Sequence, residues 1–212
     1  HLKEGVTGKT GLGIYADGMV EHDRQVGQML DKLDELGIAD NTIVMYSTDN
    51  GAEVMSWPDG GTTPFRGEKN TNYEGAWRVP CAIRWPGVIK PGTVSNELFS
   101  HQDMLPTLAA AAGDPDIVQK LKKGTKLGSK TFKNHIDGYN FLPYLTGKEK
   151  KGPRNVFFYF SDDGDMLGIR FDNWKLVFME QRTPGTMRVW ADPFTRLRMP
   201  KVFNLRTDPY ER

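Results

Sequence analysis

The chain has 212 residues, 38% of them hydrophobic, and a formal net charge of +1 at pH 7. A chain of this length can form one large domain, or one domain with a small appendage. The balanced charge gives no reason to expect a nucleic-acid or membrane-surface partner. No apolar run approaches the roughly 20 residues of a membrane span, and the single cysteine, Cys81, excludes an internal disulfide.

The first regular element that we expect is a helix over Tyr15–Leu36, after a glycine-rich loop at residues 1–14. Its apolar residues recur at intervals of three, four and seven, which is the spacing of one stripe along a helix. Gly37 follows as a candidate C′ residue, the position at which many helices end. The stripe consists of Met19, Val26, Met29, Leu30 and Leu33.

A buried strand is expected next, over Thr42–Thr48, because Ile43–Tyr46 is an apolar run typical of a strand covered on both faces of a parallel sheet. Asp49 and Asn50 follow at the carboxyl end of this strand, the edge where ligands bind in open α/β sheets. A carboxylate beside a carboxamide suits Ca²⁺ or Mg²⁺ and suits zinc poorly. A plain Asp-Asn-Gly turn is the alternative interpretation.

A long loop at residues 52–75 follows the strand, and a loop of this length inside a compact domain is usually functional. It contains Arg66 and Lys69, and Glu74 and Arg78 come at its end or just beyond. Oxygen ligands followed by cations indicate a site for a metal and an anionic group together. Three aromatic residues of the loop are candidates for lining a substrate cleft: Trp57, Phe65 and Tyr73.

A second strand is expected over Val79–Trp85, and we interpret Cys81 within it as a small buried hydrophobe. A helix is expected to run to about Ala112, because Ser100 or Asp103 can cap its N-terminus.

The last third of the chain predicts a small antiparallel sheet. A lysine-rich segment at residues 114–133 is expected to be a short surface helix and loop, and the polar run Gly147–Pro153 has the composition of a subdomain boundary. Strand-like segments separated by turn residues follow: Asn155–Phe160, Leu167–Phe171, Trp174–Glu180, Arg188–Trp190 and Val202–Leu205. We therefore expect an α/β part over residues 1–150 and a small β subdomain over residues 151–212.

Three motifs resemble, in this order, the C-terminal half of a type I sulfatase of the arylsulfatase class: STDNG at 47–51, FRGEKNTNYEG at 65–75 and RVPCAIRWPG at 78–87. The resemblance implies an α/β, alkaline-phosphatase-like core with a mostly parallel sheet and flanking helices, plus a small C-terminal antiparallel sheet. One residue departs from the family pattern, because Ala76 stands where a second glycine is usual.

The resemblance also implies roles for three residues. Asp49 and Asn50 are expected to be Ca²⁺ ligands, and Lys69 is expected to contact the sulfate oxygens and to stabilise the leaving oxygen. Arg66, the other cation of the loop, is expected to bind the substrate together with Lys69. The implied substrate is a small sulfate ester or a sulfated glycan, and the family suggests a periplasmic or secreted location.

The family's nucleophile is a formylglycine made from the first residue of a Cys/Ser-x-Pro/Ala-x-Arg motif, and this sequence contains no such motif. Cys81 is followed by Ala82, Ile83 and Arg84, which does not fit. The chain begins at His1 rather than Met, so we interpret it as a processed chain or a fragment. It is expected to be inactive alone and to have a missing N-terminal half as a partner.

Two other functions remain open from the sequence. The chain could be a non-catalytic module that captures sulfated glycans through Arg66, Lys69 and Arg78. It could also belong to another hydrolase of the alkaline-phosphatase superfamily, such as a phosphatase, which would need zinc-binding histidines. The four histidines of the chain are not spaced as His-x-x-x-His or His-x-His, which argues against a zinc site.

Overall fold

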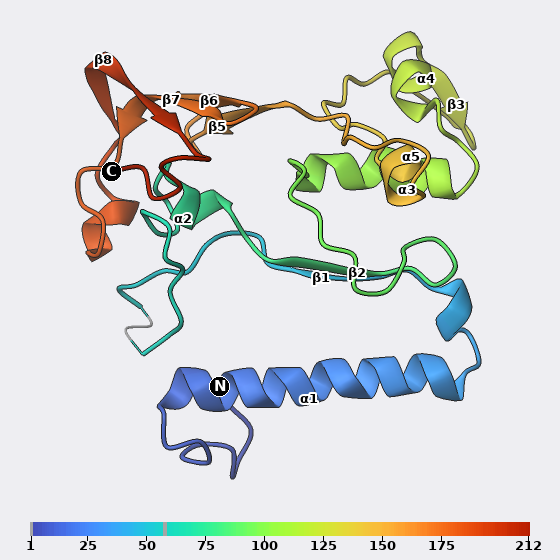
Figure 1. Ribbon diagram of the computed structural model, residues 1–212, viewed down its shortest axis with the longest axis horizontal. Helices are drawn as coiled ribbons and strands as arrows, with labels where there is room; N and C mark the ends of the chain where they lie inside the picture. Colours follow the sequence, from blue (N-terminus) through green and yellow to red (C-terminus); the bar gives the residue numbers. More distant parts are fainter. Residues whose placement is uncertain (1, 57–58) are drawn as a thin grey trace. The chain divides into compact units, whose positions relative to one another are not determined.

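The computed structural model describes residues 2–56 and 59–212 (Figure 1). The chain divides into two compact units, one formed by residues 1–86 and 158–212 and the other by residues 87–157. The subdomain boundary expected at residue 150 stays a prediction. None of the described helices combines the length and the apolar character that crossing a bilayer requires.

The predicted first helix is confirmed as α1, Ile14–Glu35. It ends as expected: Gly37 has a φ of +66°, its N–H donates to Asp34 O at 2.9 Å, and the N–H of Ile38 donates to Leu33 O at 3.1 Å. This pair of bonds is the Schellman motif, which satisfies the last carbonyl groups of a helix. A short 3₁₀ helix, η1 (Ala39–Asn41), leads on to the first strand.

The apolar stripe expected on α1 is only partly covered by the described residues. Met29 is 71% exposed, whereas the buried residues of the helix are the acidic Asp17 and Glu21. Asp17 is buried because its carboxylate accepts hydrogen bonds from the backbone of the preceding loop, at Gly8 and Thr10. The amphipathic pattern is present, but part of its apolar face, including Met19 and Met29, is exposed.

Strand β1 (Val44–Ser47) pairs antiparallel with β2 (Cys81–Arg84), with Val44 opposite Arg84 and Ser47 opposite Cys81. The parallel neighbour expected for β1 is therefore not found among the described strands. The burial expected on both faces is also wrong for this chain, because the residues of β1 are half-buried or exposed. An apolar run shows that a strand can be buried but not which strand lies beside it.

Cys81 corrects a second expectation, because its thiol is free and the residue is exposed rather than buried. It lies at the first position of β2, and the two-stranded ribbon of β1 and β2 has no further strand in the described chain. The two strands are connected by the loop and by a short helix, α2 (Glu74–Trp77).

The C-terminal antiparallel sheet is confirmed, with the strand order β5-β6-β7-β8 (Figure 1). Its strands are β5 (Val156–Phe160), β6 (Met166–Phe171), β7 (Trp174–Glu180) and β8 (Thr195–Asn204). The strand expected at Arg188–Trp190 is wrong, because Met187–Trp190 forms a 3₁₀ helix, η3. Three residues are too short a run to distinguish a strand from a helical turn.

The core of the first unit joins this sheet to the long loop. It consists of Tyr73, Val177, Phe203 and Leu205, with Leu197 packed against it. Tyr73 packs edge-on against Phe203, with 6.4 Å between ring centroids, and is only 5% exposed. It therefore pins the loop to the sheet and does not line an open cleft.

The second unit contains helices at the stretch where one was expected, around residues 100–112. Its elements are η2 (His101–Asp103), α3 (Met104–Ala111), α4 (Ile117–Lys123), the hairpin β3 (Thr125–Leu127) and β4 (Lys130–Phe132), and α5 (Leu142–Leu145). Ser100 and Asp103 form a capping box, which satisfies free N–H groups at a helix start. The hairpin within the expected surface loop was not predicted.

Asp103 also holds the second unit together through a buried ion pair. Its carboxylate accepts two hydrogen bonds from Arg154, at 2.8 Å and 2.7 Å, and another from the N–H of Tyr139 at 2.8 Å. Asp103 is fully buried and Arg154 nearly so. Removing one partner leaves the other charge buried without compensation, which costs much more than losing an exposed pair.

We predict that Arg154→Met lowers the free energy of unfolding by about 3–5 kcal/mol, measured by urea denaturation. The matched control is Lys120→Ala, which removes the exposed ion pair to Asp114 at 2.8 Å and should cost less than about 1 kcal/mol. Equal losses of stability in the two variants would contradict the stabilising role of the buried ion pair between Asp103 and Arg154.

Candidate functional site

The tip of β1 carries the two predicted metal ligands. Asp49 is exposed, and its Oδ1 accepts a hydrogen bond of 3.3 Å from the hydroxyl of Thr48. Asn50 is half-buried, and its Nδ2 donates to Gly51 O at 2.9 Å. Because the amide nitrogen is engaged in this way, the amide oxygen is the atom left for a ligand. Both residues thus offer a hard oxygen at the strand tip.

Direct backbone contact joins this strand tip to α2. The N–H of Gly51 donates to Ala76 O at 2.7 Å, and a Cβ atom built on Gly51 would overlap the carbonyl group of Gly75. Only glycine has room at this approach. Ala76, the departure from the family pattern, is accommodated within α2, where its N–H donates to Tyr73 O at 2.9 Å. Ala76 thus forms a regular part of this short helix.

The loop that carries Lys69 is held by hydrogen bonds at that residue and at the next one. The N–H of Lys69 donates to Ala52 O at 3.0 Å, which places its main chain beside the residues that follow Asn50. The next residue, Asn70, has a φ of +62° and donates from its side chain to Val189 O at 2.6 Å. The structure thus brings the loop backbone at Lys69 next to the strand tip.

Glu68 is a loop residue that the sequence did not single out. It is buried, and its carboxylate accepts hydrogen bonds from the N–H groups of Val54, at 2.8 Å, and Gly185. One side chain therefore links both arms of the long loop to the turn after β7. Neither the spacing nor the composition of the loop distinguishes this glutamate from a solvated one.

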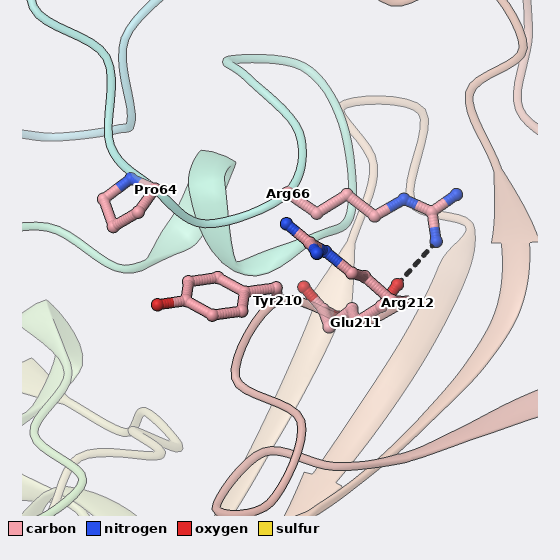
Figure 2. Close-up of a pocket in the computed structure, with 5 residues that line it drawn as sticks. All are labelled: Pro64, Arg66, Tyr210, Glu211 and Arg212. Carbon is pink, nitrogen blue, oxygen red and sulfur yellow. Dashed lines mark hydrogen bonds between the residues drawn. The ribbon is translucent and has the colours of Figure 1, made fainter.

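Arg66 is directed to the C-terminal tail. Its guanidinium donates to Glu211 O at 2.8 Å, lies 3.9 Å from the ring centroid of Tyr73 and is 3.9 Å from Glu180. A cavity of about 290 Å³ adjoins it (Figure 2), lined by Pro64, Arg66, Tyr210, Glu211 and Arg212. These contacts give Arg66 a structural role, and its part in substrate binding stays a prediction.

Of the aromatic residues proposed to line a cleft, Phe65 is half-buried beneath the guanidinium of Arg78, at 4.3 Å from the ring centroid. Trp57 lies outside the described residues. The aromatic residue that does lie near Lys69 is Trp190, at 5.3 Å from ring centroid to Nζ. The sequence placed Trp190 in a strand, so nothing in its pattern pointed to this neighbour.

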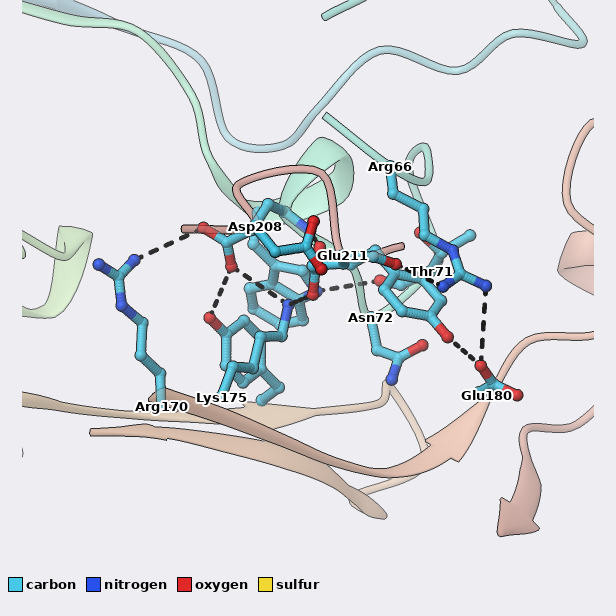
Figure 3. Close-up of polar contacts among 12 residues, drawn as sticks. Arg66, Thr71, Asn72, Arg170, Lys175, Glu180, Asp208 and Glu211 are labelled. Atoms are coloured by element: carbon cyan, nitrogen blue, oxygen red, sulfur yellow. Dashed lines mark hydrogen bonds and ion pairs between the residues drawn. The ribbon is translucent and has the colours of Figure 1, made fainter. Parts of the chain in front are cut away.

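A buried ionic cluster lies beneath α2 (Figure 3). The Nζ of Lys175 is 3.1 Å from Glu74 Oε1 and 2.7 Å from Glu211 Oε1, and all three side chains are at most 3% exposed. Glu74 also accepts a hydrogen bond from Tyr159 at 2.9 Å and pairs with Arg170 at 3.5 Å. Loop, sheet and tail are thus joined through one ammonium group.

The pKa values of the two carboxylates of this cluster are shifted in opposite directions. Burial by itself raises the pKa of Glu74, but the charges of Lys175 and Arg170 outweigh it and bring that pKa below its usual value. Burial prevails at Glu211, whose pKa is raised although Lys175 opposes the change. Burial and the nearby Glu74 charge raise the pKa of the Tyr159 hydroxyl.

The architecture is that of the alkaline-phosphatase-like hydrolases, in which this chain forms a C-terminal portion. A sulfatase of known structure from Pseudoalteromonas sp., PsFucS1, superposes with a TM-score of 0.74 at 31% identity, covering 92% of this chain and 37% of its own. Residues 8–114 match the family model described as Sulfatase. The chain belongs to the sulfatase family, and its relatives are sulfuric ester hydrolases.

Two human relatives show how much of such a protein is present. Arylsulfatase A is 34% identical over 96% of this chain, and N-acetylgalactosamine-6-sulfatase is 34% identical over 97% of it. In each case the match covers 39% of the relative. The chain therefore spans about two fifths of the length of these relatives.

We predict that Gly51→Ala lowers the free energy of unfolding by about 1–3 kcal/mol, because the added methyl group forces the strand tip away from α2. The control is Gly61→Ala, where a Cβ atom would meet no other atom within 4 Å. Urea denaturation of both variants measures the difference. A Gly51 variant as stable as the Gly61 variant would refute the close approach.

Proposed function

We propose that this chain forms the metal- and sulfate-contacting edge of a calcium-dependent sulfatase that hydrolyses sulfate esters. The observation that carries the proposal is the hydrogen bond from the N–H of Lys69 to Ala52 O, at 3.0 Å. Ala52 follows Asn50 by two residues, so this bond holds the base of the Lys69 side chain beside the oxygen-bearing strand tip. A sulfate ester carries a tetrahedral anionic group, which a metal ion and a cation can bind together.

Asp49 and Asn50 would hold the Ca²⁺ ion. The donor set suits this metal, but calcium takes 6–8 oxygen ligands. Among the residues that the structure describes, no group of three or more His, Cys, Asp or Glu side chains is arranged to hold a metal ion. The remaining ligands would come from outside these residues, from water and from the substrate. When bound, the metal would draw charge from the sulfate oxygens.

Lys69 would bind a sulfate oxygen and stabilise the leaving oxygen as negative charge develops on it. The N–H of Lys69 bonds to Ala52 O, and the side chain of the next residue, Asn70, bonds to Val189 O. The Lys69 side chain therefore starts from a fixed point of the backbone. The nucleophile would be a formylglycine outside this chain, because the sequence lacks the motif from which that residue is made.

The exposed apolar stripe of α1 and the ribbon of β1 and β2 would pack against the remainder of the sulfatase fold. The chain covers 39% of each human relative, and apolar residues such as Met29 and Tyr46 are exposed. The substrate would be a small sulfate ester or a sulfated sugar, and the relative N-acetylgalactosamine-6-sulfatase is named for one of the second kind.

We predict that Lys69→Ala lowers kcat/KM of the full-length protein for p-nitrophenyl sulfate by roughly 10²–10³, the usual cost of losing one oxyanion-stabilising group. The matched control is Lys122→Ala in the second unit, which should retain wild-type activity. Full activity in the Lys69 variant would refute the proposed role.

We predict that removal of calcium by a chelator abolishes the same activity, and that added Ca²⁺ restores it. Asp49→Ala should weaken calcium binding by calorimetry, because it removes one of two oxygens that this chain supplies. Calcium binding of wild-type strength in that variant would remove Asp49 from the metal site.

We also predict that the 212-residue chain alone releases no sulfate above background, since it lacks a nucleophile. Turnover by the isolated chain would overturn the formylglycine assignment. Binding of sulfated glycans without metal and without turnover in the full-length protein would favour the non-catalytic alternative.

A further inference from the structure

Trp190 and Glu53 accompany Lys69 at the edge of the loop. The Nζ atom of Lys69 lies 5.3 Å from the ring centroid of Trp190, within the range of a cation–π contact. Trp190 ends η3 and is 48% exposed, so its ring is accessible from solvent. Neither Trp190 nor Glu53 has a role in the proposed chemistry so far.

Glu53 fixes the orientation of the indole ring. The Nε1–H group of Trp190 donates to Glu53 Oε1 at 2.6 Å, a charge-assisted hydrogen bond across 137 residues of sequence. Hydrogen bonds from Ser56 and Trp190, together with the Lys69 charge, lower the pKa of Glu53, so its carboxylate stays ionised near neutral pH.

The backbone around the indole is fastened to the Lys69 loop as well. Val189 O accepts a hydrogen bond from Asn70 Nδ2 at 2.6 Å and another from Gln181 Nε2 at 3.3 Å. The residue before Trp190 is therefore tied to the residue after Lys69. These bonds hold the two backbone segments together, and the Lys69 ammonium lies over the indole ring.

A lysine side chain has four flexible carbon atoms and does not hold its charge in one place unaided. We propose that Trp190 is the positioning residue for Lys69, and that Glu53 keeps the indole in the orientation that receives the ammonium. The effect on turnover rests on the sulfate-binding role proposed for Lys69. The position of the ammonium over the ring does not depend on that role.

The position of the ammonium can be measured by NMR on the full-length protein after reductive methylation of its lysines with ¹³C-formaldehyde. Lys69→Arg identifies the dimethylated Lys69 signal. We expect this signal to be shifted upfield by the indole ring current, to lose that shift in Trp190→Leu and to keep it in Trp174→Leu. Trp174 is a suitable control because it is 51% exposed on β7, in the same unit. A Lys69 signal unchanged in Trp190→Leu overturns the proposal.

The consequence for catalysis is tested by a double-mutant cycle on kcat/KM. An exposed cation–π contact predicts a loss of about two- to fivefold for Trp190→Leu. Glu53→Gln should show a smaller loss, and Trp174→Leu none. In the Lys69→Ala background, Trp190→Leu should cause no further loss, because the residue acts through Lys69.

The outcomes separate the possible errors. An equal loss in both backgrounds overturns the proposal, since Trp190 then acts on the substrate or the fold directly. A wild-type protein without sulfatase activity, but with the expected NMR shifts, refutes the proposed function and retains the positioning of Lys69.

Discussion

The structure of the first unit depends on the burial of one ammonium group, that of Lys175, between Glu74 and Glu211. An isolated charge in a protein interior costs several kcal/mol, so a buried lysine must keep its carboxylates. The three residues come from β7, from the start of α2 and from the C-terminal tail, which are far apart in the sequence. None of these segments can move away without leaving a charge unpaired. The cluster therefore fixes α2 against the sheet.

The candidate site follows from the position of α2. Its Ala76 carbonyl group receives the N–H of Gly51, and the glycine at that point allows the strand tip to approach closely. Further along the chain from Gly51, the N–H of Lys69 donates to Ala52 O, which places the loop beside the strand tip. Electrostatics in the interior thus determines the geometry at the surface, through a short series of backbone contacts. The chemistry of a sulfate site needs this rigidity, because binding an anionic sulfate group and stabilising the charge that develops on the leaving oxygen depend on fixed charges.

The predictions from sequence succeeded where the physical signal is local. The extent of α1 and its Schellman end follow from apolar spacing and Gly37, and the capping box follows from Ser100 and Asp103. The predictions failed where the burial or the conformation of a residue depends on which segment packs beside it. Cys81 was expected to be buried, but no described strand covers it. Trp190 was expected in a strand, but a segment of three residues suits a helical turn equally well.

The sequence by itself determined the family, several of the helices and strands and the residue types at the strand tip, because these depend on local propensity and on motif spacing. Only the tertiary structure decided which distant residues meet: Glu74 with Lys175, Trp190 with Lys69, and Gly51 with Gly75. The physical reason is that ion pairing, cation–π contact and close backbone approach act through space, so residues far apart in the sequence can satisfy them without leaving a regular pattern along the chain.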